Sequence, residues 1–158
     1  MVTSPATRPS SLTGVAGLES ELTLLARHTL QTSQHAPDRF LDRSGYQLLG
    51  RLEHGPLSLK QLAEAFRLDQ STVNRQVNAL RRGGLVRRVA DPDGGTALLI
   101  EPTTQGRAAL RRDRAVAHRQ LGDVLADWTA TDIEQLHAML EKFNVSIENL
   151  EGRPWPRP

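Results

Sequence analysis

Residues 58–84, SLKQLAEAFRLDQSTVNRQVNALRRGG, decide the fold of this chain. Ser58 followed by Gln61 has the sequence of a capping box, in which the hydroxyl accepts from the third backbone amide of a helix and the glutamine reaches back to the first. The box predicts a short helix that starts here. Its apolar positions are Leu59, Leu62, Ala63 and Phe66.

A second helix is predicted directly after the first. Asp69 or Ser71 can serve as its N-cap, and Gly83 with Gly84 forms a glycine stop after Arg82. Two short helices joined by a tight turn, the second of them rich in polar residues, are typical of a helix-turn-helix motif.

The second helix has two different sides. At about 100° per residue, Val73, Val77 and Leu80 share one narrow side, which predicts a buried stripe. The opposite side carries only side chains that suit base edges or phosphates, namely Ser71, Asn74, Arg75, Asn78 and Arg82. No acidic residue occurs between Gln70 and Val89. A solvated helix face ordinarily mixes both signs of charge, so we interpret this face as one that contacts DNA.

Two short β-prone runs follow, residues 85–90 and 96–100, on either side of the turn Asp91–Gly95. They predict a hairpin, and a hairpin directly after a recognition helix is the wing of a winged helix-turn-helix. Arg87 and Arg88 fall on its first strand, where neighbouring side chains alternate faces, so at least one should point outward. The predicted DNA-contacting residues are Lys60, Gln70, Ser71, Thr72, Asn74, Arg75, Asn78, Arg82, Arg87 and Arg88.

Amphipathic helices are predicted on both sides of this lobe, over residues 13–34, 44–53 and 104–127. Thr131 with Glu134 predicts a capping box that opens a last helix with a regular apolar stripe. Long terminal helices have no single core between them, so we expect a second copy of the chain to cover their apolar faces. The predicted dimerisation residues are Leu18, Leu22, Leu25, Leu121, Trp128, Ile133, Leu136, Leu140, Phe143 and Ile147.

Composition narrows the classes of function. The 158 residues include no cysteine, which excludes disulfides, thiolate metal sites and thiol redox sensing. The five histidines include no i, i+4 pair, and no phosphate loop, nucleophile elbow or zinc-hydrolase motif occurs, so we predict no metal, no cofactor and no catalysis. The longest apolar run, Ala97–Ile100, is far too short for a membrane span, and we expect a cytoplasmic protein without membrane contact.

Charge is distributed unevenly along the chain. The net charge is only +2, yet residues 60–119 carry 12 basic and 6 acidic side chains, while residues 120–158 carry 3 and 7. Such asymmetry within a nearly neutral chain indicates a local contact with a polyanion. The middle third is therefore the part expected to face DNA.

These features, in this order, resemble the MarR family of transcriptional regulators over about residues 13–150. The resemblance is carried by the long first helix and by the segments Ser58–Ala63, Ser71–Arg75, Gly83–Val86, Asp91–Gly94 and Thr103–Arg107. It implies a homodimer whose two recognition helices enter successive major grooves of pseudo-palindromic double-stranded DNA. It also implies a small-molecule effector that binds between the dimerisation helices and the DNA-binding lobe and releases the DNA. The aromatic residues available to line such a site are Phe40, Tyr46 and Trp128.

The wing departs from the family pattern. Family members usually carry an arginine at the wing tip that enters the minor groove, whereas this chain reads Gly94, Gly95, Thr96, Ala97. We therefore expect weaker and less shape-selective binding than in a relative with that arginine.

The predicted fold is mainly α with a small β-hairpin wing, a winged helix-turn-helix with long flanking dimerisation helices. Its expected parts are a disordered tail (1–12), an N-terminal dimerisation helix (13–36), the DNA-binding lobe (38–102), C-terminal dimerisation helices (103–151) and a second tail (152–158). The expected function is sequence-specific regulation of transcription, as a repressor that binds its operator as a homodimer. The alternative is an adaptor that uses a winged helix to bind another protein without specific DNA binding.

Overall fold

The computed structural model describes residues 12–34 and 39–157, with side chains from residue 14 to 28 and from 39 onward. These residues belong to two units, the first ending at Pro37 and the second starting at Asp38. Within the first unit, α1 spans Leu12–Gln34, as the apolar spacing predicts. The tail predicted for residues 1–12 lies outside the described residues, except for Leu12, which begins α1.

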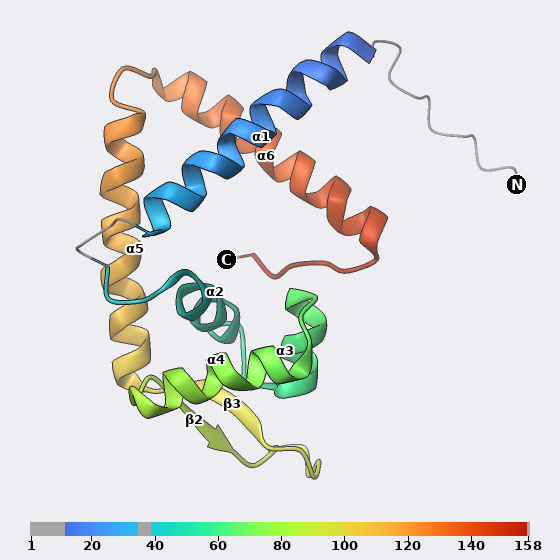
Figure 1. Cartoon of the computed structure of the whole chain (residues 1–158), viewed down its shortest axis with the longest axis vertical. Coiled ribbons are helices and arrows are strands. Elements are labelled where there is room, and N and C mark those ends of the chain that lie inside the picture. The colour runs from blue at the N-terminus through green and yellow to red at the C-terminus, as the bar shows by residue number, and fades with distance from the viewer. Residues whose placement is uncertain (1–11, 35–38, 158) are drawn as a thin grey trace, which may run out of the picture. The chain divides into compact units, whose positions relative to one another are not determined.

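The second unit contains the predicted winged helix-turn-helix, and the fold class is confirmed (Figure 1). Its helices and strands occur in the order expected from the sequence, with one additional strand. They are α2 (Arg43–Leu52), β1 (Leu57–Ser58), α3 (Leu59–Phe66), α4 (Gln70–Arg82), β2 (Val86–Val89), β3 (Leu99–Pro102), α5 (Thr104–Val124) and α6 (Ala130–Glu151).

The capping predictions for the helix-turn-helix are confirmed in most details. Ser58 and Gln61 form the capping box at the start of α3, with N···O distances of 2.8 and 3.2 Å. Asp69 is the N-cap residue of α4, although its side chain makes no capping hydrogen bond, and Gly83 is the C-cap. The turn between α3 and α4 uses Arg67 in the left-handed region, at φ 53°.

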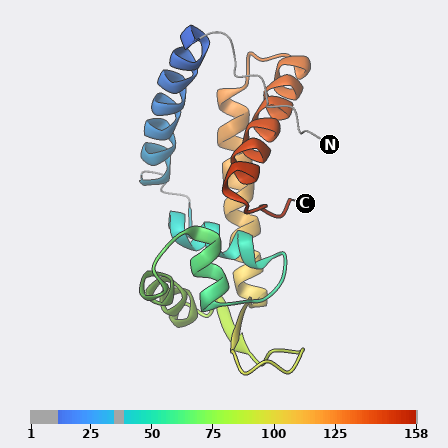
Figure 2. The ribbon, with the colours of Figure 1, turned by 90° about the vertical axis from the view of Figure 1, so that its right-hand side faces the viewer.

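The sheet has three antiparallel strands in the order β1-β3-β2, so the prediction of a two-stranded hairpin alone was incomplete. Leu57 pairs with Ile100, and the outermost pair of the wing is Val89 with Leu99. The second wing strand therefore begins at Leu99 rather than at residue 96, and residues 90–98 form the loop. Figure 2 shows this hairpin projecting beyond α3 and α4.

A single apolar core holds the lobe together. Its most deeply buried side chains come from α2, α3, α4, the sheet and the first half of α5, and they include Leu48, Leu49, Leu52, Leu62, Val73, Val77, Ile100 and Leu110. Gly106 lets α5 approach the loop before β2, because a Cβ at this position would collide with the carbonyl oxygen of Leu85. This contact fixes the start of α5 against the lobe.

Asp113 of α5 is fully buried and accepts two backbone hydrogen bonds. The N–H groups of Phe40 and Leu41 donate to its two carboxylate oxygens at 2.9 and 2.8 Å. A buried carboxylate is tolerated when its oxygens are satisfied in this way. Asp113 therefore attaches the segment before α2 to α5.

The capping box of the last helix lies two residues earlier in the sequence than predicted. Thr129 and Asp132 form the capping box at the start of α6, so the prediction of Thr131 with Glu134 was wrong. Both threonines stand three residues before an acid, and the box that forms is the earlier one. The hydroxyl and the backbone N–H of Thr129 both donate to the carboxylate of Asp132, and these two hydrogen bonds lower the pKa of that carboxyl.

Residues 153–157, predicted to be part of a tail, instead contact the winged helix-turn-helix and α6. The ring of Trp155 lies edge-on to Phe66 of α3, and Arg157 forms an ion pair with Glu148 of α6. The composition of this segment, rich in proline and arginine, favours disorder, but a tryptophan and two arginines find partners here.

Candidate DNA-binding surface

The orientation of α4 is fixed by its buried stripe. Val73 and Val77 have no exposed surface and Leu80 is 7% exposed, which confirms the side of α4 predicted to face the core. The opposite side therefore faces away from the lobe. Ser71, Arg75 and Arg82 on that side are exposed, and Thr72, Asn74 and Asn78 are partly buried.

Hydrogen bonds along α4 orient several of these side chains. Arg75 donates from Nη2 to Oγ1 of Thr72 at 3.3 Å, and Asn78 donates from Nδ2 to Oδ1 of Asn74 at 3.2 Å. The amide oxygen of Asn78 is buried and has no partner among the described residues. A contact between Asn78 and a base therefore requires the asparagine to rotate outward, whereas Arg75 is already exposed.

The residues at the edges of this face are also exposed. Gln70 is the first residue of α4, and Lys60 lies in the first turn of α3 with its side chain in solvent. The sequence of α4 contains no acidic residue and carries three arginines. Arginine can bind the two acceptors on the major-groove edge of guanine, and asparagine can bind the acceptor and the donor on that of adenine. This face therefore has the chemistry of a major-groove surface.

The two wing arginines differ in the partners they have. Arg87 lies opposite Glu101 across the β2–β3 pair and binds its Oε1 through both Nε and Nη2, at 2.6 Å each. Arg88 lies opposite Ile100, is exposed, and forms no ion pair within the described segments. Of the two predicted wing contacts, Arg88 thus has the less compensated charge.

Two positions of the wing tip, Gly94 and Gly95, disfavour a side chain for different reasons. Gly94 has φ +82°, which an L side chain rarely adopts, and a Cβ at Gly95 would collide with the carboxylate of Asp91. That carboxylate also accepts from the backbone N–H of Asp93 at 3.0 Å. The tip is built by two glycines and an aspartate turn, which explains how it folds without a basic side chain.

The predicted dimerisation residues lie on exposed surfaces. Those on α5, α6 and their connection have side chains between 37% (Phe143) and 55% (Leu121) exposed, and α6 buries no residue within the described chain. Leu18 and Leu25 on α1 are each 50% exposed, and Leu22 is partly buried. A row of large apolar side chains in solvent is typical of an interface.

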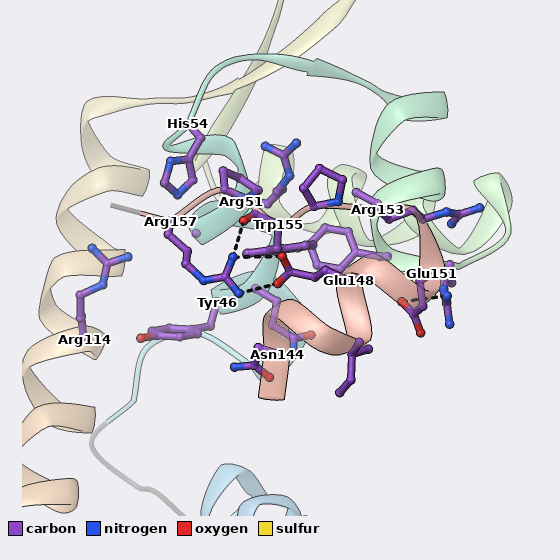
Figure 3. Close-up of a pocket in the computed structure, with 18 residues that line it drawn as sticks. Tyr46, Arg51, His54, Arg114, Asn144, Glu148, Glu151, Arg153, Trp155 and Arg157 are labelled. Atoms are coloured by element: carbon purple, nitrogen blue, oxygen red, sulfur yellow. Dashed lines mark hydrogen bonds and ion pairs between the residues drawn. The ribbon is translucent and has the colours of Figure 1, made fainter. Parts of the chain in front are cut away.

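A cavity of about 700 Å³ lies between the lobe, the end of α6 and residues 153–157 (Figure 3). Of the three aromatic residues predicted for an effector site, only Tyr46 lines it. Phe40 lines a different groove beside Arg75, and Trp128 lines neither. Phe66 and Trp155 supply the other aromatic rings. The sequence predicts Phe66 only as an apolar position of its helix, and Trp155 was missed because residues 152–158 were predicted to be a tail.

The cavity lining is rich in arginine. Five arginines line it, Arg51, Arg67, Arg114, Arg153 and Arg157, against two acids, Glu148 and Glu151. Arg114 is held by Glu53 at 2.8 Å, and this hydrogen bond is the main cause of the raised pKa of Arg114. Arg51 lies 5.6 Å from the centre of the Trp155 ring, and its Nε is buried without a hydrogen-bond partner in the described structure.

Two other kinds of site are not found in the described residues. No group of three or more histidine, cysteine, aspartate or glutamate side chains there could hold a metal ion. No helix in the same ranges has both the length and the apolar content needed to cross a membrane.

Comparison with known proteins identifies the lobe. The MarR family model matches residues 41–95. The uncharacterized HTH-type transcriptional regulator YxaD of Bacillus subtilis is 34% identical over 129 residues, which are 80% of this chain and 90% of YxaD. A MarR family protein from Bacillus stearothermophilus has a similar structure, with a TM-score of 0.78, 23% identity, and coverage of 88% of this chain and 99% of that one. RV1404 from Mycobacterium tuberculosis superposes with a TM-score of 0.71 at 22% identity, over 96% of this chain and all of its own.

Three findings indicate the same family. The lobe is a winged helix-turn-helix, the outer side of its second helix has no acid, and four fifths of the sequence are similar to a transcriptional regulator. This chain therefore belongs to the MarR family of transcriptional regulators.

Proposed function

We propose that this regulator is a homodimeric repressor that binds a pseudo-palindromic operator and inserts one α4 into the major groove of each half-site. The observation that carries the proposal is the outer side of α4, which has arginine, asparagine and serine and no carboxylate. Each phosphate that a cation neutralises releases counterions and strengthens binding, and a carboxylate at the same place opposes it. The lack of acids on this face is expected for a surface that meets DNA.

The residues divide into two proposed roles. Arg75 contacts bases from the centre of α4, because it lies on the side opposite the buried Val77, and Asn74 contacts them from the edge of that side. Lys60, Gln70, Ser71, Thr72, Arg82 and Arg88 surround them and contact phosphates. Arg87 contributes less, because Glu101 already compensates its charge.

A second copy of the chain is the proposed partner of α6. The stripe Ile133, Leu136, Leu140, Phe143, Ile147 is exposed in the single chain, so folding of one copy leaves it in water. Burial of apolar area is favourable at about 25 cal/mol per Å², and two such stripes bury each other in a symmetric dimer. The dimer in turn places two α4 helices on one DNA duplex.

The cavity beside α2 is the proposed effector site. Its walls come from the lobe (Tyr46, Arg51, Phe66) and from α6 with residues 153–157, so a bound molecule would touch both. A molecule that prefers one arrangement of lobe and α6 shifts the population toward it. Release of DNA by such an effector, in the cytoplasm, is part of the proposal.

Selection of DNA fragments from the source genome by the purified protein tests this function. The selected duplex and a scrambled duplex of the same composition are then titrated at about 50 and about 200 mM salt, a range over which a protein with 6–10 phosphate contacts loses about 10³ to 10⁵ in affinity. We expect preferential, salt-sensitive binding of the selected duplex. Absent or salt-insensitive binding contradicts the proposal and favours the protein-binding adaptor.

A further inference from the structure

The segment after α6 is used neither by the DNA-binding face nor by the proposed dimer stripe. Gly152 ends α6 in the left-handed region, at φ 65°, and the backbone N–H of Arg153 donates to the carbonyl of Glu148 at 3.0 Å. This glycine cap turns the chain away from the helix axis. Residues 153–157 then lie along the cavity between α6, α2 and α3 (Figure 3).

Trp155 makes the aromatic part of this contact. Its ring centroid lies 5.3 Å from that of Phe66 with the planes at 70°, an edge-on arrangement. The guanidinium carbon of Arg51 lies 5.6 Å from the centre of the indole. Edge-on aromatic pairs and cation–π contacts each stabilise beyond the apolar area they bury. Through Trp155 the segment contacts both α2 and α3.

Polar contacts hold the segment on both sides of Trp155. Arg153 donates from Nη1 to the carbonyl oxygen of Glu64 in α3 at 2.8 Å. Arg157 binds both carboxylate oxygens of Glu148 in α6, at 2.6 and 3.0 Å, a two-pronged geometry that is stronger than a single contact. This pair lowers the pKa of the Glu148 carboxyl.

A further ion pair links the same two parts of the molecule. Arg67, in the turn between α3 and α4, binds Glu151 in the last turn of α6 at 2.8 Å. Exposed pairs of this kind contribute little one at a time. Here the Arg67–Glu151 pair accompanies the contacts of Trp155 and Arg153 with α3, so the end of α6 and the segment after it meet the helix-turn-helix through several contacts. The Arg157–Glu148 pair holds the same segment on α6.

We propose that residues 153–157 form a strap that ties the end of α6 to α3, and that high-affinity operator binding requires this strap to be docked. The inference rests on the proposed function. Since α3 packs on α4 and α6 carries the proposed dimer stripe, the docked strap limits how α4 can turn relative to the dimer partner. Two recognition helices must match two half-sites at once, and a pre-organised pair avoids part of the ordering cost of binding.

Docking of the strap and binding of the operator are thermodynamically linked. If docking of the strap favours operator binding, operator binding favours docking of the strap by the same factor. The state of Trp155 should therefore respond to operator DNA, although its ring contacts are with Phe66 of α3 and Arg51 of α2.

The test uses the full chain labelled with 5-fluorotryptophan, which has two fluorine signals because the sequence contains two tryptophans. The signal lost in Trp155→Phe identifies Trp155. We expect that signal to sharpen and become less accessible to a soluble quencher when operator is added. A Trp155 signal as exposed as in the unfolded chain, with or without operator, overturns the strap.

Affinity measurements with three variants complete the test. Removal of the residues after Gly152 and the reversal Arg157→Glu should each weaken operator binding by about 5- to 150-fold, the usual range of coupling between sites, with unchanged dimer mass and unchanged binding of scrambled duplex. The matched control is the double variant Arg157→Glu with Glu148→Arg, which restores the pair with opposite polarity and should restore the affinity. Full operator affinity of the shortened chain overturns the strap alone, whereas failure of the intact chain to select DNA overturns the proposed function as well.

Discussion

The helices α4 and α6 are both amphipathic, but they expose opposite kinds of side chain. α4 buries Val73 and Val77 completely and leaves its polar side in solvent, whereas α6 buries nothing in the described chain and leaves apolar residues in solvent. The position of α4 is thus determined by its own chain. The apolar side of α6 stays exposed unless another molecule covers it. One copy of the chain therefore suffices to orient α4, whereas burial of the α6 stripe requires the proposed dimer.

The largest effect is expected from acids on the α6 stripe. The double variant Leu136→Asp with Leu140→Asp should convert the protein into a folded monomer at micromolar concentration, because each leucine contributes about 1.5 to 3 kcal/mol when fully buried and the stripe occurs in both copies. Operator affinity should fall with the dimer. Sedimentation gives the mass, and circular dichroism checks that the lobe keeps its helices.

The matched control places the same acid on the same helix, away from the stripe. Gln135→Asp should keep the dimer mass and the operator affinity. If the double variant sediments with the same mass as the wild type, α6 is not the dimer surface. The exposed apolar side of α6 would then need another explanation.

A substitution on the polar side of α4 should have the next largest effect. Arg75→Ala is expected to cost about 1 to 3 kcal/mol of operator binding and to relax the preference at one base pair, while dimer mass and thermal stability stay unchanged. Arg119→Ala, an exposed arginine in the second half of α5, is the control. Titration against operators varied one base pair at a time measures both quantities, and an unaltered base preference would show that α4 does not read the groove through Arg75.

The smallest effect is expected at the wing, where two neighbouring arginines lie on alternate faces of β2 and differ in their partners. Arg88→Ala should weaken all duplexes alike and reduce the slope of log affinity against log salt by about 1. Arg87→Ala should change the slope less, because Glu101 already binds Arg87. Glu101→Gln frees Arg87 and should steepen the slope. Equal slopes for the two alanine variants would mean that the Arg87–Glu101 pair opens on DNA.

The sequence predicts the parts of this fold whose cause is local. The Ser58–Gln61 box, the Val73–Val77 stripe and the Gly83 stop each depend on residues within one or two helical turns, and all three are confirmed. The start of α6 was misplaced because two overlapping threonine–acid spacings compete, and only the folded chain shows which of them forms.

Features that depend on distant partners could not be predicted. Strand β1 consists of Leu57 and Ser58, which become a strand only because Ile100 and Leu99 lie beside them. Docking of Trp155 likewise depends on Phe66 and Arg51, about ninety residues or more away in the chain. The roles of the DNA-contacting and dimerisation residues stay predictions, since each requires a molecule other than this single copy.

Asp113 bears on how the sequence of this chain can vary. Its carboxylate binds the main-chain N–H groups of residues 40 and 41 and no part of their side chains. The side chains at these two positions can therefore be exchanged without loss of the hydrogen bonds, apart from proline, which has no N–H to donate. The number of residues between Phe40 and the start of α2 cannot change so freely, because an insertion or deletion would move both N–H donors away from the Asp113 carboxylate. In a set of related sequences, the half-exposed position 40 should vary most in identity, since Leu41 is buried in the core and Asp42 caps α2. The length of residues 40–42 should stay constant wherever position 113 is an aspartate.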